Sequence, residues 1–139
     1  MTTARDIMTP QAHTVGDSAS LVEAATLMRD HGVGALPVTS DDGALAGIIT
    51  DRDIVVNGVA ASHDVGAVAV GTVTQGIVST VSPDEDVDRV VGVMGDQQIK
   101  RLVVVDGHDV VGMISESDLA QSVDEDKIVD FVQRVYGRS

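Results

Sequence analysis

Residues 47–54 read GIITDRDI and residues 112–119 read GMISESDL, so one pattern occurs twice in the chain. Each copy has a glycine, two apolar residues and a hydroxyl residue, with an aspartate three positions after the hydroxyl. An apolar run that ends in Thr or Ser before acidic residues is typical of a strand that leads into a capped helix. Upstream, residues 15–38 and 81–104 keep the same apolar pattern in phase. The chain therefore contains a unit of about 65 residues twice.

Each copy opens with a predicted amphipathic helix. Its apolar residues stand at positions i, i+3, i+4 and i+7, which gives a helix one apolar face. They are Leu21, Ala24, Ala25 and Met28 in the first copy, and Val87, Val90, Val91 and Met94 in the second. Ser20 with Glu23 forms a predicted capping box, Asp86 is the corresponding cap, and Gly32 is a predicted helix end.

A hairpin and a second helix follow in each copy. The predicted strands are residues 35–38 and 45–49, joined by a turn at 41–43, and residues 102–105 and 110–114, joined by a turn at 106–107. The predicted helices after them cover residues 51–60 and 116–122. We therefore predict an α/β (α+β) fold in which each unit has the order helix, strand, strand, helix around a small sheet.

We divide the chain into a first unit (1–60), a linker (61–69), a second unit (70–123) and a C-terminal helix (124–139). Ser122 and Glu125 form a predicted capping box for that last helix, which carries both aromatic residues, Phe131 and Tyr136. Residues 70–74, which open the second unit, match the corresponding residues of the first unit poorly.

Composition and charge exclude several functions. The net charge is −13 with only two lysines, Lys100 and Lys127, which argues against nucleic acid and membranes as partners. The absence of cysteine excludes disulfides and thiolate metal sites, and the four histidines lack metal-ligand spacing. No secretory signal is recognisable, so we expect a cytoplasmic protein. No catalytic motif is present, and we expect no enzymatic activity and no required cofactor.

The doubled unit resembles the CBS-domain family, specifically a stand-alone tandem CBS pair (Bateman module) of the bacterial and archaeal type. The resemblance rests on GIITDRD at 47–53, RDIMT at 5–9, VGALPV at 33–38 and GMISESD at 112–118. It implies two units whose sheets pack around a pseudo-twofold axis and leave two clefts for adenosyl ligands. It also implies a homodimer that regulates a separate, unknown protein effector.

The residues themselves suggest how such a ligand is held. Thr50 and Ser115 are predicted to lie at helix N-termini, where backbone N–H groups attract phosphate. Asp53 and Asp118 can each accept hydrogen bonds from both hydroxyls of a ribose. The resemblance implies that Arg101, with Lys100 beside it, meets phosphate charge in the second copy, where the first copy has Ala35 in place of Arg101. The predicted adenine pocket is apolar and consists of Ile7, Met8, Ala35, Leu36 and Val38.

Two interpretations stay open. The Thr-x-x-Asp and Ser-x-x-Asp turns are also what plain helix caps look like, and one turn can serve both roles. The first hypothesis is a sensor that binds AMP, ADP, ATP or S-adenosylmethionine. The alternative is a dimeric structural or stress-response protein with degenerate, empty sites, which is favoured by Ala35 and by Val103 in the place of Pro37.

Overall fold

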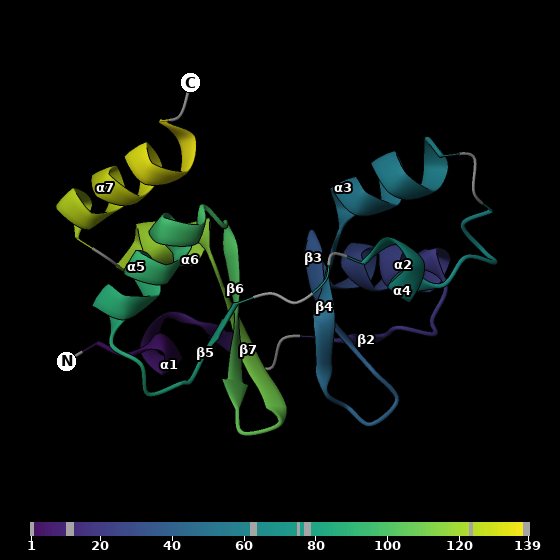
Figure 1. The fold of residues 1–139 in the computed structure, drawn as a ribbon, viewed down its shortest axis with the longest axis horizontal. Coiled ribbons are helices and arrows are strands. Elements are labelled where there is room, and N and C mark those ends of the chain that lie inside the picture. The colour runs from purple at the N-terminus through teal and green to yellow at the C-terminus, as the bar shows by residue number, and fades with distance from the viewer. Residues whose placement is uncertain are drawn as a thin grey trace. The chain divides into compact units, whose positions relative to one another are not determined.

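The computed structural model describes residues 2–10, 13–61, 64–74, 76, 79–122 and 124–137. The chain forms two compact units: unit 1 comprises Met1–Gln11 with Ser79–Ser139, and unit 2 comprises Ala12–Val78. Both ends of the chain, purple and yellow in Figure 1, belong to unit 1. The N-terminal segment thus belongs to the same unit as the second sequence repeat. The predicted boundaries of the repeats and the linker, near residues 60, 69 and 123, stay predictions.

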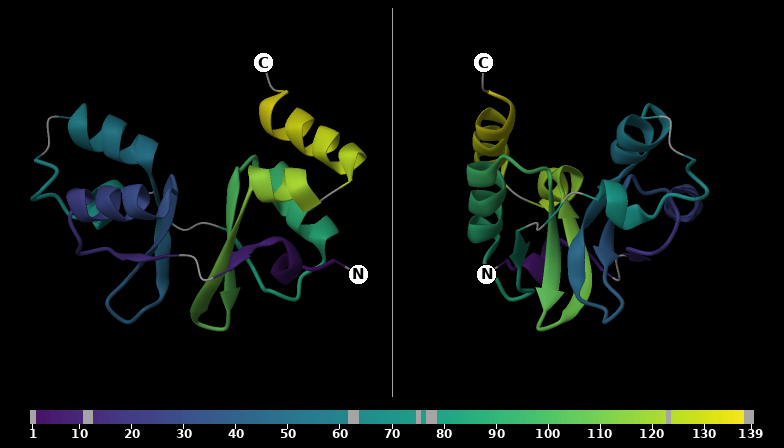
Figure 2. Two further views of the ribbon diagram at one scale, coloured as in Figure 1. Left: turned by 180° about the vertical axis from the view of Figure 1, so that it is seen from behind. Right: turned by 45° about the vertical axis from the view of Figure 1, so that its right-hand side comes forward.

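Unit 2 is a three-stranded sheet, in the order β2-β3-β4, with its helices on one face. All views in Figures 1 and 2 place α2, α4 and the α3 segment on the same side of β3 and β4. The elements are β2 (Val15–Gly16), α2 (Leu21–His31), β3 (Ala35–Thr39), β4 (Leu45–Thr50), α3 (Asp51–Asp53), η1 (Ile54–Val59) and α4 (Val70–Val73). α3 runs directly into the π-helical η1, so the predicted helix over 51–60 is present.

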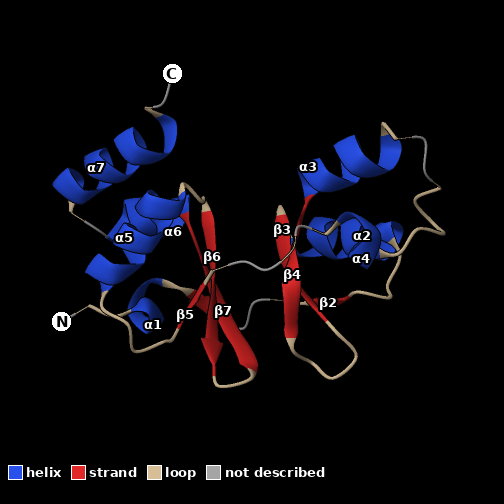
Figure 3. Cartoon of the chain, in the orientation of Figure 1, coloured by secondary structure: helices blue, strands red, loops and turns tan. Residues whose placement is uncertain are grey.

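Unit 1 is a four-stranded sheet in the order β1-β7-β6-β5, again with helices against one face (Figure 3). Its elements are α1 (Ala4–Ile7), β1 (Thr9–Pro10), β5 (Thr80–Val81), α5 (Val87–Gln97), β6 (Arg101–Asp106), β7 (Asp109–Ser115), α6 (Glu116–Ser122) and α7 (Glu125–Tyr136). The predicted mixed α/β fold with one small sheet in each half is confirmed. The short elements α1, α4, β1, β2 and β5 were not predicted, because stretches of two to four residues show no readable period.

The two hairpins have the same register, which confirms the repeat at the level of backbone pairing. Ala35 lies opposite Thr50 in unit 2, and Arg101 lies opposite Ser115 in unit 1. Each hairpin shifts register at the equivalent place, after Val38 and after Val104. The turns contain Gly43 and Gly107 with φ of 87° and 62°, values that glycine adopts without steric cost.

Each repeat contributes its opening helix to the unit built on the other repeat. α1 of the first repeat buries Ala4 and Ile7 in the core of unit 1. α4 of the second repeat buries Val70 in the core of unit 2. Residues 70–73 therefore form the counterpart of α1 although their sequence matches poorly, and both helices bury the apolar residue at their first position, Ala4 and Val70.

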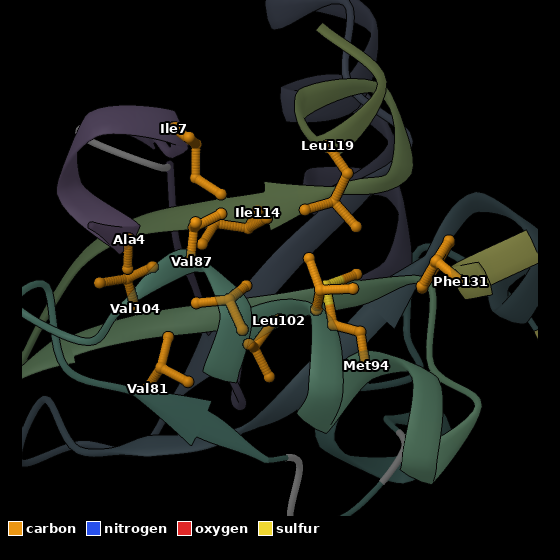
Figure 4. Close-up of a cluster of buried hydrophobic side chains, with 12 residues drawn as sticks. Ala4, Ile7, Val81, Val87, Met94, Leu102, Val104, Ile114, Leu119 and Phe131 are labelled. Carbon is orange, nitrogen blue, oxygen red and sulfur yellow. The ribbon is translucent and has the colours of Figure 1, made fainter. Parts of the chain in front are cut away.

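Figure 4 shows the core of unit 1, where side chains from four helices meet β6 and β7. Ile7 comes from α1, Met94 from α5, Leu119 from α6 and Phe131 from α7, and all four are buried. Burying an apolar side chain of this size contributes about 1.5–3 kcal/mol. α7 is thus part of the core of unit 1.

The predicted caps at Ser20, Gly32, Thr50 and Asp86 are confirmed, and the one at Ser122 is wrong. Ser20 and Glu23 form a capping box, Asp86 accepts a hydrogen bond from the backbone N–H of Asp88, and Gly32 ends α2 with φ of 65°. The capping box at Ser122 is wrong, because Ser122 is the last residue of α6 and the N-cap of α7 is Asp124. A Ser-x-x-Glu match cannot tell the start of one helix from the end of the preceding one.

The described part of the predicted linker is tied to unit 2 by hydrogen bonds. The backbone N–H groups of Leu21 and Val22, at the start of α2, donate to the carbonyls of Val68 and Val65 at 3.1 and 3.0 Å. Those N–H groups would otherwise lack a partner at a helix N-terminus. Within the described ranges, no helix is both long enough and apolar enough to cross a lipid bilayer.

Candidate functional site

The second hydroxyl-and-aspartate turn lies in unit 1, where β7 ends and α6 begins. The backbone N–H of Ser115 donates to Oδ2 of Asp118 at 2.8 Å, and the Ser115 hydroxyl donates to the same oxygen at 3.1 Å. The Asp118 side chain is half-buried. Its carboxylate is therefore held in place by the turn and still reaches the surface.

Thr9 of β1 supplies a third donor to this carboxylate. The register Thr9 to Met113 pairs β1 with β7, and the Thr9 hydroxyl donates to Oδ1 of Asp118 at 3.2 Å. Both oxygens of Asp118 thus accept hydrogen bonds from hydroxyl groups that can rotate to other acceptors. Thr9 was not among the predicted site residues, although it belongs to the segment at 5–9 on which the family resemblance partly rests.

Two cations lie beside the same turn. Arg101 is directly opposite Ser115 across the β6–β7 hairpin, and directly opposed residues have their Cβ atoms about 5 Å apart on one face. Lys100 precedes it and places its Nζ 4.9 Å from the centre of the Tyr136 ring. The structure therefore places Arg101 opposite Ser115 and Lys100 next to it in the chain, whereas their predicted role in binding a ligand stays a prediction.

Tyr136, from the last turn of α7, also reaches this region. Its hydroxyl donates to Glu116, the first residue of α6, at 2.8 Å to Oε1 and 2.7 Å to Oε2. This hydrogen bond raises the pKa of Tyr136 above its usual 10.0; burial and the Glu116 charge act in the same direction, and the Arg101 charge opposes them. Neither residue was predicted to lie at the site, because no local sequence pattern links the two.

The first hydroxyl-and-aspartate turn lies in unit 2. Its hairpin has the same register as that of the second turn, but fewer positive charges lie beside it. Thr50 and Asp53 form a reciprocal capping box, with the Thr50 N–H donating to Oδ2 of Asp53 at 2.8 Å and the Asp53 N–H donating to the Thr50 hydroxyl at 3.1 Å. Asp53 is only 5 % exposed. The residue opposite Thr50 is Ala35, so the hairpin offers no cation there. The counterpart of Thr9 is Gln75, which lies outside the described residues.

The residues of the predicted adenine pocket are divided between the two units. Ile7 and Met8 belong to unit 1, and Ala35, Leu36 and Val38 belong to unit 2. Ile7, Leu36 and Val38 are buried inside the cores of their own units, with Leu36 and Val38 at 1 % and 0 % exposure. Met8 is half-buried and packs over Gly112 of β7. Within unit 1, Met8 is thus the apolar side chain of this set that stands beside the Asp118 turn.

Other surface features lie away from these turns. A groove of about 310 Å³ between α5 and α7 is lined by Asp88, Val91, Lys127 and Arg134, among others. A second groove in unit 2, of about 460 Å³, runs along α2 past Val15. Within the part of the chain that the structure describes, no cluster of three or more His, Cys, Asp or Glu side chains is arranged to hold a metal ion.

Comparison with known proteins agrees with the repeat. The profile of the CBS domain matches residues 4–58 and again residues 69–125. Hypoxic response protein 1 of Mycobacterium tuberculosis is 38 % identical over 135 residues, which cover 97 % of this chain and 94 % of that protein. The solved structures that the chain resembles at 30 % identity or more include the following two.

The first is the crystal structure of Hypoxic Response Protein I with two coordinated zinc ions, with a TM-score of 0.79 and 37 % identity, covering 88 % of this chain and all of that one. The second is a CBS domain pair in complex with 5′-methylthioadenosine and S-adenosyl-L-methionine, with a TM-score of 0.76 and 30 % identity, covering 87 % and 94 % of the two chains. The two family matches, the shared hairpin register and these relatives lead to one conclusion: the chain belongs to the CBS-domain family and carries the domain twice.

Proposed function

We propose that this protein is a regulatory module that binds an adenosyl ligand at the Asp118 turn of unit 1, and that it is not an enzyme. The observation that carries the proposal is the convergence of the Thr9 and Ser115 hydroxyls on the anchored carboxylate of Asp118, with Arg101 opposite Ser115 across the hairpin. A plain helix cap needs Ser115 and Asp118 alone. Helix capping does not require the Thr9 hydroxyl, which comes from another strand, or the arginine at position 101, which lies opposite Ser115.

The carboxylate is suited to a ribose. A carboxylate offers about four acceptor positions, and Asp118 uses three of them on Ser115 and Thr9. The bond from the Ser115 backbone N–H fixes the side chain and persists when a ligand arrives. The two protein hydroxyls then rotate away, and the two hydroxyls of a ribose take their places as donors. The free protein thus keeps its carboxylate paired until the sugar replaces those bonds, which limits the desolvation cost of binding.

Phosphate or another anionic group fits the cation pair beside this turn. Arg101 lies across the hairpin from Ser115, so a group bonded to the Ser115 hydroxyl is within reach of the guanidinium. Charge-assisted hydrogen bonds of this kind are about twice as strong as neutral ones. A related pair, 30 % identical, is described in complex with two adenosyl compounds, which supports this ligand class.

The turn in unit 2 is proposed as a weaker site. Asp53 has the backbone setting of Asp118, but Ala35 offers no charge where Arg101 stands in unit 1. We expect AMP, ADP and ATP to prefer the Asp118 turn, and ligands without phosphate to discriminate less between the two turns. We further propose that the module acts as a cytoplasmic homodimer on a separate protein.

The second candidate function is a structural or stress-response protein whose sites bind nothing physiological. The observation that favours it is the reciprocal capping box at Thr50 and the buried Asp53, in which the hydroxyl and the carboxylate each already accept a hydrogen bond from the other residue's backbone N–H. This hypothesis predicts that neither turn binds an adenosyl ligand at millimolar concentration.

Isothermal titration calorimetry and thermal shift with AMP, ADP, ATP, S-adenosylmethionine, 5′-methylthioadenosine and GMP decide between the two. At 100 times its dissociation constant, a ligand that binds only the folded protein adds about 2.7 kcal/mol of stability. Asp118→Asn keeps the shape of the side chain but removes its charge, and we expect it to weaken binding at least about tenfold. The matched control is Asp109→Asn, an exposed carboxylate at the other end of β7. Equal affinities of the two variants would overturn the assignment of Asp118.

A further inference from the structure

α7 extends beyond the region that matches the CBS domain, which ends at residue 125, and it is firmly attached to unit 1. Phe131 is 2 % exposed in the core. Lys127 pairs with Asp88, and the side-chain amide of Gln98 donates to the carbonyl of Arg134 at 3.1 Å. These contacts anchor both halves of the helix on α5. These contacts hold the last turn of α7, and with it Tyr136, in a fixed position on unit 1.

Tyr136 has a different partner at each end. Its hydroxyl donates to both oxygens of Glu116, at 2.8 and 2.7 Å, and the ammonium of Lys100 lies 4.9 Å from its ring centre. Arg101 is also close enough for its charge to act on the Tyr136 hydroxyl. One side chain from outside the matched region thus contacts Glu116 and Lys100, the neighbours of Ser115 and Arg101.

Glu116 would otherwise be a competitor of an anionic ligand. It follows Ser115 directly, and Ser115 lies opposite Arg101. Among the described residues, no carboxylate forms an ion pair with Lys100 or Arg101, so neither cation is committed to a negative charge. Glu116 instead accepts the one proton of the neutral Tyr136 hydroxyl, which is shared between both carboxylate oxygens. A carboxylate held in this way has less freedom to move to the neighbouring cations.

We propose that Tyr136 is a specificity-determining residue of this site: it restrains Glu116 and thereby keeps Lys100 and Arg101 free for the phosphate of the ligand. This inference rests on the proposed function, because it concerns the same site. It adds that selectivity for phosphate-bearing over uncharged adenosyl ligands depends on the C-terminal helix. In the described part of the chain, no such helix follows the first repeat, so its turn lacks this control.

The test compares AMP with adenosine, which differ by the phosphate alone, on full-length variants. Tyr136→Phe keeps the ring under Lys100 but removes the hydroxyl, and it releases Glu116 to pair with the cations. We expect AMP affinity to fall about two- to fivefold, the range for one exposed charge interaction, while adenosine affinity stays unchanged. Glu116→Gln in the Tyr136→Phe background should restore AMP affinity, because the competing charge is gone. Glu125→Gln removes an exposed charge from the start of α7 and is the matched control.

A spectroscopic measurement distinguishes this role from a general loss of structure. The chain has a single tyrosine, so tyrosine labelled with ¹³C gives one set of ring resonances. We expect these resonances to shift when AMP binds and to stay in place when adenosine binds. Equal AMP affinity in the wild type and Tyr136→Phe would overturn the inference, and so would an equal loss of AMP and adenosine affinity.

The two proposals fail in different ways. If adenosine binds and Asp118→Asn abolishes its binding while Tyr136→Phe changes nothing, the proposed function stands and the role of Tyr136 is wrong. If the wild type binds neither ligand, both proposals are wrong.

Discussion

Replacing Phe131 by alanine tests whether α7 is part of the core of unit 1. Phe131 is 2 % exposed and lies in the same cluster as Met94 of α5 and Leu119 of α6 (Figure 4). The ring therefore fills the space between α7 and the helices α5 and α6. Those two helices lie within the residues that match the CBS domain, whereas α7 begins where the match ends. Truncation to alanine leaves a cavity that the surrounding helices can close only in part.

The expected cost follows from this burial. Phe-to-Ala changes in protein cores reduce the free energy of unfolding by about 3–5 kcal/mol, and whole domains have about 5–15 kcal/mol. For a chain of this length we expect the midpoint of thermal unfolding to fall by about 10–20 °C. Val132, the next residue, is 45 % exposed, and Val132→Ala should change the free energy of unfolding by less than about 0.5 kcal/mol.

The measurement is urea unfolding of the wild type and both variants, followed by circular dichroism at a wavelength that reports helix content. The difference between Phe131→Ala and Val132→Ala is the decisive quantity, because both substitutions lie on α7 and share its helix propensity effects. A loss below about 1 kcal/mol for Phe131→Ala would refute the reasoning. It would mean that α7 contributes little to the core and cannot position Tyr136.

Three further predictions concern single interactions. Gly112→Ala would place a Cβ atom 2.9 Å from the carbonyl oxygen of Thr9, so we expect β1 to be displaced and urea unfolding to show a loss of about 1–3 kcal/mol. The ionisation of Tyr136, followed by absorbance at 295 nm, should occur above pH 10.0, and Glu116→Gln should bring its pKa back toward that value. Because the pKa of Tyr136 is raised in the folded state, the stability that its protonated hydroxyl contributes is complete below the unfolded pKa and is lost as the pH rises through the folded pKa. Ionisation at or below pH 10.0 would contradict the contact between Tyr136 and Glu116. Ser20→Ala removes the side-chain acceptor of a capping box and should cost about 1 kcal/mol in thermal unfolding, whereas an unchanged midpoint would show that the cap is dispensable.

Sequence reasoning succeeded where neighbours along the chain decide the structure. Ser20 and Gly32 mark the ends of α2 because capping and the left-handed conformation depend on a few adjacent residues. The hairpins follow from the glycine turns, and the repeat gives them one register. The prediction was wrong at Ser122. The four-residue pattern there is typical of a helix start, but Ser122 is the last residue of α6.

The candidate site was predicted in part for the same reason. Ser115, Asp118 and Arg101 belong to one hairpin and the helix after it, so their grouping follows from the local order of elements. Thr9 and Tyr136 reach the site from both ends of the chain, and no periodicity predicts that.

The amino-acid sequence by itself determined the doubled unit, its helices and hairpins, and the two turns that pair a hydroxyl with an aspartate. Periodicity and capping are local properties, which a sequence displays directly. Only the tertiary structure decided that α1 packs with the second repeat and α4 with the first, and that Thr9 contacts Asp118 across 109 positions. Such contacts depend on which apolar faces bury each other most completely, and that is a property of the folded chain as a whole.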